Sequence, residues 1–515
     1  MDGGKDIRGA VHTNVRHDSA IKHVSGKAVY IDDMPELPGT QEVALLLSPH
    51  AHAKILSIET GEAAVMPGVH GVVTAADIPG VNDVAPVFED EPALAFGVVE
   101  YVGMPVAAVA ADTYDQALAA VRAVRVAYEE LTPVLSIEEA WEKEQFTYNP
   151  PKIVFGDAEA ARSGAAHIVS GEVSCGGQDH FYLESHIALA VPGEDGDMTV
   201  YSSTQHPTEA QHGVSRVLGV ALNDVTIEVR RMGGGFGGKE SQSTIIAAIA
   251  ALLADQCRRP VKLRLRRDDD MVATGKRHDF LFKYEIGFDE HGRIDSAVID
   301  MAARSGNVAD LTAGVVARAL CHGNNAYYIP NAMFRGWPCK TNTVSNTAFR
   351  GFGGPQGMIA IETAIEHIAH DLGKSVDEIR AVNWYGTDDR NVTPYGQRVT
   401  DNIMPEIVER LAREVGLDDR RKAIDEFNAS NDTLKKGIAL MPVKFGISFN
   451  APMLNQAGAL VHVYTDGSVH LNHGGTEMGQ GLFVKMAQVV SSVFQIDIDH
   501  VKISATRTDK VPNTA

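Results

Sequence analysis

A glycine-rich loop between a strand and a helix constrains this sequence more than any other feature. The loop RRMGGGFGGKES spans residues 230–241. Before it, Val225, Ile227 and Val229 alternate with polar residues, which predicts a half-buried strand. After it, the alanine- and leucine-rich stretch 243–257 ends shortly before Pro260 and predicts a helix. Such a loop presents unobstructed backbone N–H groups beside a positive helix end, which favours an anionic or polar ligand.

The loop fits two nucleotide-binding patterns, but neither completely. Gly233 to Lys239 satisfies G-x-x-x-x-G-K, yet Glu240 stands where a phosphate loop needs Ser or Thr to bind magnesium. The same glycines satisfy G-x-G-x-x-G, but Asp255, near the required acidic position, falls at the end of the predicted helix instead of on a strand. ATP and dinucleotides are therefore disfavoured. A turn that only allows tight strand–helix packing stays open.

Length and charge narrow the class of protein. A chain of 515 residues predicts about three domains. Its 46 basic and 67 acidic residues give a net charge of −21, which argues against nucleic acid or an anionic membrane as a partner. The first residues lack the apolar core of a secretory signal, and the longest strongly apolar run, 245–254, is too short to span a bilayer. We expect a cytoplasmic protein with no membrane segment.

The cysteines indicate neither a disulfide framework nor a metal site. They are far apart and form no C-x-x-C pair, so zinc and iron–sulfur clusters are not expected in this chain. We expect buried thiols at Cys175, Cys257, Cys321 and Cys339.

Turn-rich stretches predict three domains, at 1–150, 151–395 and 396–515. In the first, residues 106–128 are typical of a βαβ-like unit whose helix is opened by Thr113 with Gln116 as its capping-box partner. The third contains a hairpin with Asp466-Gly467 at its turn.

Two further glycine loops also lead into predicted helices. NTAFRGFGGPQG spans 346–357 and HGGTEMGQG spans 473–481. Together with the first loop they could wrap an extended ligand through backbone donors and a few side chains, here Arg350 and Gln480. Each loop taken singly is equally well explained as a helix-entry turn.

Five segments carry a resemblance to a known family. STQHPTEAQ, RMGGGFGGKES, SNTAFRGFGGPQGM, KFGISF and LNQAGALVHVYTDGSVHLNHGGTEMGQG look like the molybdenum-cofactor subunit of the xanthine dehydrogenase family, in the family's order and over nearly the whole chain. The resemblance implies an α+β fold. An α/β hammerhead-like domain at 1–150 would be followed by molybdenum-cofactor-binding domains at 151–395, with the substrate pocket, and at 396–515, the latter incomplete.

The resemblance also implies the ligand of the glycine loops, a molybdopterin in place of a nucleotide. Phe236 and Gly237 would lie against the molybdenum centre, with Gln205 near an oxygen ligand of the metal. Arg350 and Gln480 would bind the cofactor. No protein side chain is expected to ligate molybdenum directly, which suits a chain without a Cys or His ligand cluster.

The implied substrates are hypoxanthine and xanthine, oxidised to urate with oxygen taken from water. Phe352 and Phe449 match the pair that sandwiches the purine, Arg318 the cation that stabilises developing negative charge, and Glu240 the acid that hydrogen-bonds the ring edge. Aldehyde oxidases usually carry smaller or apolar residues at the last two positions, so an aldehyde or other N-heterocycle hydroxylase is the alternative. The copper-binding cysteine of carbon monoxide dehydrogenases is absent beside Phe352.

Two expectations follow from features of the family that do not occur in this sequence. The family's general base, a Glu in a G-E-P-P segment, does not occur, and Glu477 matches only a cofactor-loop position. We therefore expect a truncated chain, with a cofactor- or partner-binding fragment without turnover as the non-enzyme alternative. Since the chain has neither iron–sulfur cysteines nor a flavin motif, electrons would pass to a separate iron–sulfur/FAD subunit in a dimer of heterodimers.

Overall fold

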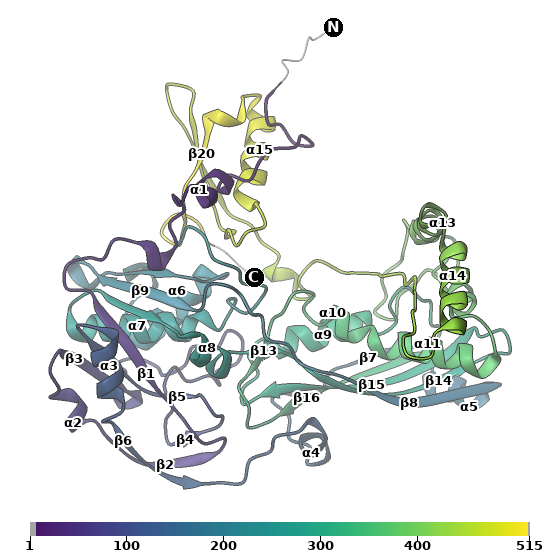
Figure 1. The fold of residues 1–515 in the computed structure, drawn as a ribbon, viewed down its shortest axis with the longest axis horizontal. Coiled ribbons are helices and arrows are strands. Elements are labelled where there is room, and N and C mark those ends of the chain that lie inside the picture. The colour runs from purple at the N-terminus through teal and green to yellow at the C-terminus, as the bar shows by residue number, and fades with distance from the viewer. Residues whose placement is uncertain (1–6, 513–515) are drawn as a thin grey trace.

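The computed structural model describes residues 7–512 and arranges them in three lobes (Figure 1). One lobe is built on a large mixed sheet, a second on a sheet covered by helices, and a third is a small module that also holds the N-terminal segment. The chain contains both helices and strands, and its sheets include parallel and antiparallel pairs, which confirms the predicted α+β class.

An eight-stranded sheet forms the first lobe, in the order β21-β11-β10-β9-β12-β1-β5-β3. Strand β1 pairs in parallel with β12 and antiparallel with β5, so the sheet continues across the boundary predicted near residue 150. Its strands are β1 (Gln41–Leu47), β3 (Val69–Thr74), β5 (Pro105–Ala111), β9 (Ile187–Pro192), β10 (Met198–Ser202), β11 (Val225–Val229), β12 (Val261–Arg264) and β21 (Thr506–Arg507).

The unit predicted at 106–128 has the expected elements but not the expected pairing. Helix α3 (Tyr114–Val121) follows β5, and the Thr113 hydroxyl accepts a hydrogen bond from the Gln116 N–H at 3.3 Å. Strand β6 (Arg125–Glu130), however, pairs antiparallel with β2 (Ala53–Glu59) in a separate sheet, β4-β2-β6, with β4 at Val98–Val99. The βαβ-like prediction is therefore wrong: the two strands belong to different sheets because β6 finds its partner earlier in the chain.

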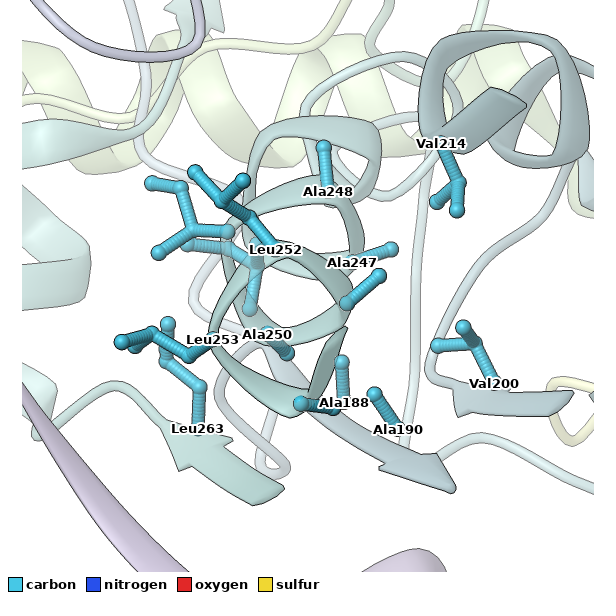
Figure 2. Packing of buried hydrophobic residues seen from close by; sticks show 14 of the residues in the cluster. Ala188, Ala190, Val200, Val214, Ala247, Ala248, Ala250, Leu252, Leu253 and Leu263 are labelled. Atoms are coloured by element: carbon cyan, nitrogen blue, oxygen red, sulfur yellow. The ribbon is translucent and has the colours of Figure 1, made fainter. Parts of the chain in front are cut away.

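Helix α7 (Ser243–Cys257) is the centre of the first lobe's core (Figure 2). Its residues from Ser243 to Ala254 are all buried, as expected for a helix that is apolar on every face. The small side chains of Ala247 and Ala250 allow close packing on the alanines of β9 and on α6 (Pro207–Leu218). This buried helix fixes the position of the glycine loop that precedes it.

The second lobe is a five-stranded sheet in the order β7-β16-β15-β14-β8. Phenylalanines of β14 pack under α9 and α11, and the latter helix occupies the stretch predicted after the second glycine loop. The strands are β7 (Lys152–Phe155), β8 (His167–Cys175), β14 (Phe280–Phe288), β15 (Ile294–Gly306) and β16 (Ala332–Lys340); the helices are α5 (Ala158–Gly164), α9 (Thr312–His322), α10 (Gly354–Gly357), α11 (Ile359–Leu372) and α12 (Val376–Asn383).

The third lobe contains the predicted hairpin. Strands β18 (Ala459–Val463) and β19 (Val469–His473) flank the Asp466-Gly467 turn, and β20 (Val501–Ile503) pairs with β19. Helix α15 (Leu482–Phe494) packs beside them and also holds the N-terminal segment, since Gln488 donates a hydrogen bond to the Ala10 carbonyl at 2.9 Å. Helices α13 (Met404–Val415) and α14 (Leu417–Ser430) lie on the outside of the second lobe (Figure 1).

The remaining elements are short connections between these units. The parallel pair of β13 (Lys276–Arg277) with β17 (Asn346–Thr347) precedes the second glycine loop. The short helices are α1 (Ala20–Val24), α2 (Gly61–Ala64), α4 (Ile137–Glu142) and α8 (Arg267–Ala273).

The cysteines are free throughout the described part of the chain, and Cys339 is buried. The prediction that all of them are buried thiols is wrong for Cys175, Cys257 and Cys321, which are only partly buried. Cys257, for example, is the last residue of α7, where the helix leaves the core. No described helix is both long and apolar enough to cross a membrane.

Candidate functional site

The glycine loop is a backbone cradle closed against two neighbouring segments. The Gly237 N–H donates to Gln205 Oε1 at 2.8 Å. Gly237 has φ +101°, and a Cβ added there would lie 2.7 Å from the backbone of Ala348. A Cβ on Gly235 would lie 2.5 Å from Gln205 Oε1. Glycine is therefore required at both positions, one for its left-handed backbone and both for close approach.

The lysine of the phosphate-loop pattern points into the protein. Lys239 is fully buried, and its Nζ forms an ion pair with Glu184 Oε2 at 3.0 Å. The same carboxylate oxygen accepts the Gly233 N–H at 2.9 Å. Burial lowers the pKa of Lys239, and the Glu184 carboxylate opposes that shift. The lysine thus ties the two ends of the loop together and does not project toward a ligand.

The three glycine loops predicted from the sequence meet at one place. The Arg350 N–H donates to the Phe236 carbonyl at 2.8 Å, which joins the first loop to the second. The Met232 N–H donates to the Glu477 carbonyl at 2.9 Å, which joins the first loop to the third. Contacts between segments that are distant in the sequence therefore bring Gln205, Phe236, Gly237 and Arg350 into one neighbourhood.

Glu477 shapes the third loop from within. Its Oε1 accepts the Gly479 N–H at 2.9 Å and the Gly481 N–H at 3.1 Å, and its Oε2 accepts the Phe483 N–H at 3.2 Å. A buried carboxylate so occupied caps the N-terminus of α15. Gln480 is exposed, and its amide folds back onto the loop, donating to the Thr476 carbonyl at 2.9 Å.

A cavity of about 590 Å³ lies beside this meeting point. Glu240, directly after the cradle, and Phe449 both line it. The Phe449 and Phe352 rings lie 5.7 Å apart at 50° to each other, and both lie close to Gly314 in the cavity wall. The structure thus brings the two predicted aromatic residues together as a tilted pair in contact, not as two parallel faces with a gap between them.

Arg318 lies behind this wall, on α9. It is buried; one guanidinium nitrogen donates to the Ser448 carbonyl at 2.7 Å and another to the Gly446 carbonyl. Its carbon Cζ is 5.6 Å from the centre of the Phe352 ring. Burial lowers the pKa of Arg318, while the nearby charges of Cys321 and Glu240 act in the opposite direction.

Glu240 is the most strongly perturbed acid that faces the cavity. Burial, and next the neighbouring carboxylate of Glu209, raise its pKa to about 7 against the opposing effects of His206 and Arg318. Glu240 is therefore close to half protonated at neutral pH. A group in this state can both donate and accept a proton or a hydrogen bond.

Sequence reasoning missed Glu209, His206 and Asp310 around Glu240. The first two lie at the start of α6, where an acidic residue is common because it complements the helix dipole, so the sequence carried no signal of a further role. Asp310 adopts φ +38° and is buried, and burial raises its pKa to about 7. Only the fold brings it near the others.

The glycines of the cradle allow neighbouring segments to approach the loop closely. Glycines stand where any side chain would fill the space beside Gln205 and Ala348. In the described part of the chain, one set of His, Asp and Glu atoms has the spacing of a metal site, namely His17, Asp18 and Glu477. Asp18 is already paired with Arg230 at 3.0 Å, and Glu477 holds backbone N–H groups. The residues present therefore fit a cofactor that supplies its own metal ligands.

Comparison with protein families defines the class of these domains. Residues 25–132 match "Aldehyde oxidase and xanthine dehydrogenase, a/b hammerhead domain". Residues 141–384 and 410–515 each match "Molybdopterin cofactor-binding domain". The predicted hammerhead domain followed by two cofactor-binding domains is thereby confirmed, and molybdopterin is the cofactor of these domains.

Curated relatives narrow the class further. The chain is 44% identical over 513 residues to xanthine dehydrogenase/oxidase of Gallus gallus, which is 99% of this chain and 38% of that protein. It is 45% identical over 508 residues to xanthine dehydrogenase of Oryza sativa subsp. japonica, covering 98% and 37%. The chain belongs to the xanthine dehydrogenase family and spans less than two-fifths of the length of these relatives.

Solved structures share the fold. Aldehyde oxidoreductase from Desulfovibrio gigas superposes with a TM-score of 0.85 at 24% identity, over 99% of this chain and 57% of that one. Quinoline 2-oxidoreductase from Pseudomonas putida 86 gives 0.85 at 23% identity, over 100% and 69%. At these identities the likeness concerns the fold.

Proposed function

We propose that the complete protein is a molybdenum hydroxylase that oxidises hypoxanthine and xanthine to urate. The observation that carries the proposal is the cavity lined by both Glu240 and Phe449, beside the cradle that Gln205 closes. The identity to xanthine dehydrogenases over nearly the whole chain supports the same substrate class.

Gln205, Phe236, Gly237, Arg350 and Gln480 hold the cofactor in this proposal. When bound, the cofactor supplies the two-electron oxidation and delivers oxygen that comes from water. The chain's own contribution is to fix the cofactor's position through loops that are themselves hydrogen-bonded to one another, and to keep the Gly237 N–H directed at Gln205.

The cavity residues orient the ring and stabilise its charge. A flat purine packs against Phe352 and Phe449, while Glu240 hydrogen-bonds the ring edge. As negative charge builds on the ring during the reaction, the buried guanidinium of Arg318 stabilises that state more than the neutral ground state. These roles make Arg318 and Glu240 the catalytic residues of the proposal.

An electron acceptor completes the proposed reaction. We propose that electrons leave to iron–sulfur clusters and FAD carried by a partner subunit, in a dimer of heterodimers; residues 1–515 contain neither iron–sulfur cysteine spacing nor a flavin motif. This arrangement would be contradicted if the intact protein purified as an active NAD reductase that contains only one kind of subunit.

The experiment that tests the proposed function is an isotope assay on the complete protein. Xanthine is supplied in ¹⁸O-labelled water with an artificial electron acceptor, and urate is analysed by mass spectrometry. The proposal expects one labelled oxygen per urate and little turnover of benzaldehyde. Efficient benzaldehyde oxidation without urate formation would establish the aldehyde alternative instead.

A further inference from the structure

Glu209 stands beside Glu240 in the wall of the cavity, although sequence reasoning gave it no role. It lies in the first turn of α6, and both carboxylates line the same cavity. Its Oε2 is held by His206 Nδ1 at 2.9 Å. Its Oε1 is buried and has no hydrogen-bond donor within residues 7–512. Burying an acceptor without a donor is costly, so a donor is expected next to this oxygen.

The candidate for that donor is a protonated Glu240, which lines the same cavity. Two carboxylates that face one cavity cannot both stay ionised at low cost. When such a pair holds one proton, the protonated carboxyl group donates a hydrogen bond and the ionised carboxylate accepts it. His206 Nδ1 already occupies Oε2 of Glu209, so Oε1 is the atom left to accept a hydrogen bond from Glu240. The upward shift of the pKa of Glu240, caused first by burial and next by Glu209, agrees with this distribution.

The other charged groups around Glu240 do not replace Glu209 in this role. From α6 it is faced by Glu209 and His206, from the turn before α9 by Asp310, and from α9 by Arg318. Of the acids, Asp310 is fully buried and does not line the cavity. Arg318 favours the ionised form of Glu240 and is itself held by backbone carbonyls.

We propose that Glu209 is a positioning and specificity-determining residue: it shares one proton with Glu240, so that the cavity presents a carboxylic acid to a substrate edge that accepts a hydrogen bond. The proposal rests on the proposed function and names the substrate class more closely. A heterocycle with a ring nitrogen or carbonyl oxygen at this edge meets an O–H donor, whereas benzaldehyde has no ring atom that accepts it.

The test compares Glu209→Gln with wild-type holoenzyme and with Glu89→Gln. Glu89 is a matched control because it is an exposed acid that pairs with Arg216 at the cavity rim, 3.3 Å away. The first readout is kcat/KM against pH for hypoxanthine and for benzaldehyde. Loss of the Glu209 charge makes Glu240 ionise at lower pH, so the alkaline limb for hypoxanthine moves down by about one pH unit or more. The Glu89→Gln profile and the benzaldehyde profile stay in place.

A second readout does not depend on turnover. Infrared difference spectra between wild type and Glu240→Gln at pH 6.5 show the C=O stretch of a protonated carboxylic acid, and in Glu209→Gln this band disappears at lower pH than in wild type. An absent band in wild type, or a limb and band unmoved in Glu209→Gln, would overturn the shared proton. A wild type that shows the band but never oxidises hypoxanthine would instead contradict the proposed function.

Discussion

At the scale of single residues, Arg318 combines two tasks. Its guanidinium lies 5.6 Å from the Phe352 ring and also holds the Ser448 carbonyl. Arg318→Met removes the preorganised cation, so kcat for xanthine falls on the order of 10²–10³-fold while molybdenum content stays normal. Arg216→Met, the same change at a cation that lines the cavity, is the control and leaves kcat within about threefold of wild type. Unchanged xanthine turnover at full cofactor occupancy would remove Arg318 from its assigned role.

Glu240 makes the stability of the fold depend on pH. Its folded pKa of about 7 lies above the ordinary value of 4.5, so between these pH values the unfolded chain releases a proton that the folded chain keeps. Stability from this group is complete below pH 4.5 and is lost as pH rises through 7. Glu240→Gln removes the penalty, and we expect its melting temperature to exceed that of wild type at pH 8 but not at pH 5. Equal pH dependence in both proteins would contradict the shift.

The side chain at position 240 also decides between substrate classes. Glu240→Val replaces a hydrogen-bonding acid in the cavity wall with an apolar group, so the ratio of kcat/KM for benzaldehyde to that for xanthine rises by about 10- to 100-fold. Steady-state assays of both substrates measure the ratio. A variant that loses both activities in proportion would show that Glu240 supports the site only structurally.

At the scale of elements, the glycine loop depends on a buried ion pair. Lys239→Met leaves the Glu184 carboxylate buried without its cation, which costs about 3–5 kcal/mol and frees the Gly233 end of the loop. We expect a lower melting temperature and reduced molybdopterin content. The double variant Lys239→Met/Glu184→Leu removes both charges and recovers part of the melting temperature. If the double variant were no more stable than the single one, the pair would not act as a unit.

The sequence predicted individual strands, helices and turns, but it did not predict which distant segments they contact. Alternating residues predicted β11, the alanine-rich stretch predicted α7, and Asp466-Gly467 predicted the β18–β19 turn. The wrong βαβ-like unit and the missed Lys239–Glu184 pair have a common cause, since both depend on contacts between distant segments. Periodicity and turn chemistry are local signals, whereas strand partners and buried ion pairs are set by packing.

The same distinction holds for the candidate site: some of its residues could be named from the sequence, but their arrangement could not. Resemblance named Gln205, Phe236 and Arg350, and the fold brings them together through hydrogen bonds that no spacing in the sequence shows. Glu209 carried no signal because an acid in the first turn of a helix is ordinary. The roles of all these residues remain predictions until variants are measured.

At the scale of the whole molecule, the proposed cofactor site lies where the three lobes meet. The first lobe contributes the loop at 233–239, the second lobe the loop at 346–353, and the small module the loop at 473–481. A ligand that contacts all three ties the lobes together. We therefore expect cofactor-loaded protein to melt at higher temperature and in fewer transitions than cofactor-free protein, as calorimetry measures. Identical thermograms would show that the cofactor does not bridge the lobes.

The most direct measurement is the molybdopterin content of purified protein with alanine in the cradle. Gly237→Ala places a Cβ 2.7 Å from the Ala348 backbone at φ +101°, whereas Gly467→Ala changes a glycine of similar φ, +82°, in the open hairpin turn. Wild type and Gly467→Ala should each carry close to one molybdopterin per chain, determined by mass spectrometry of the released cofactor, and Gly237→Ala should lose most of it while circular dichroism stays unchanged. Full molybdopterin content in Gly237→Ala, or none in folded wild type, would contradict a cofactor cradle at the three glycine loops.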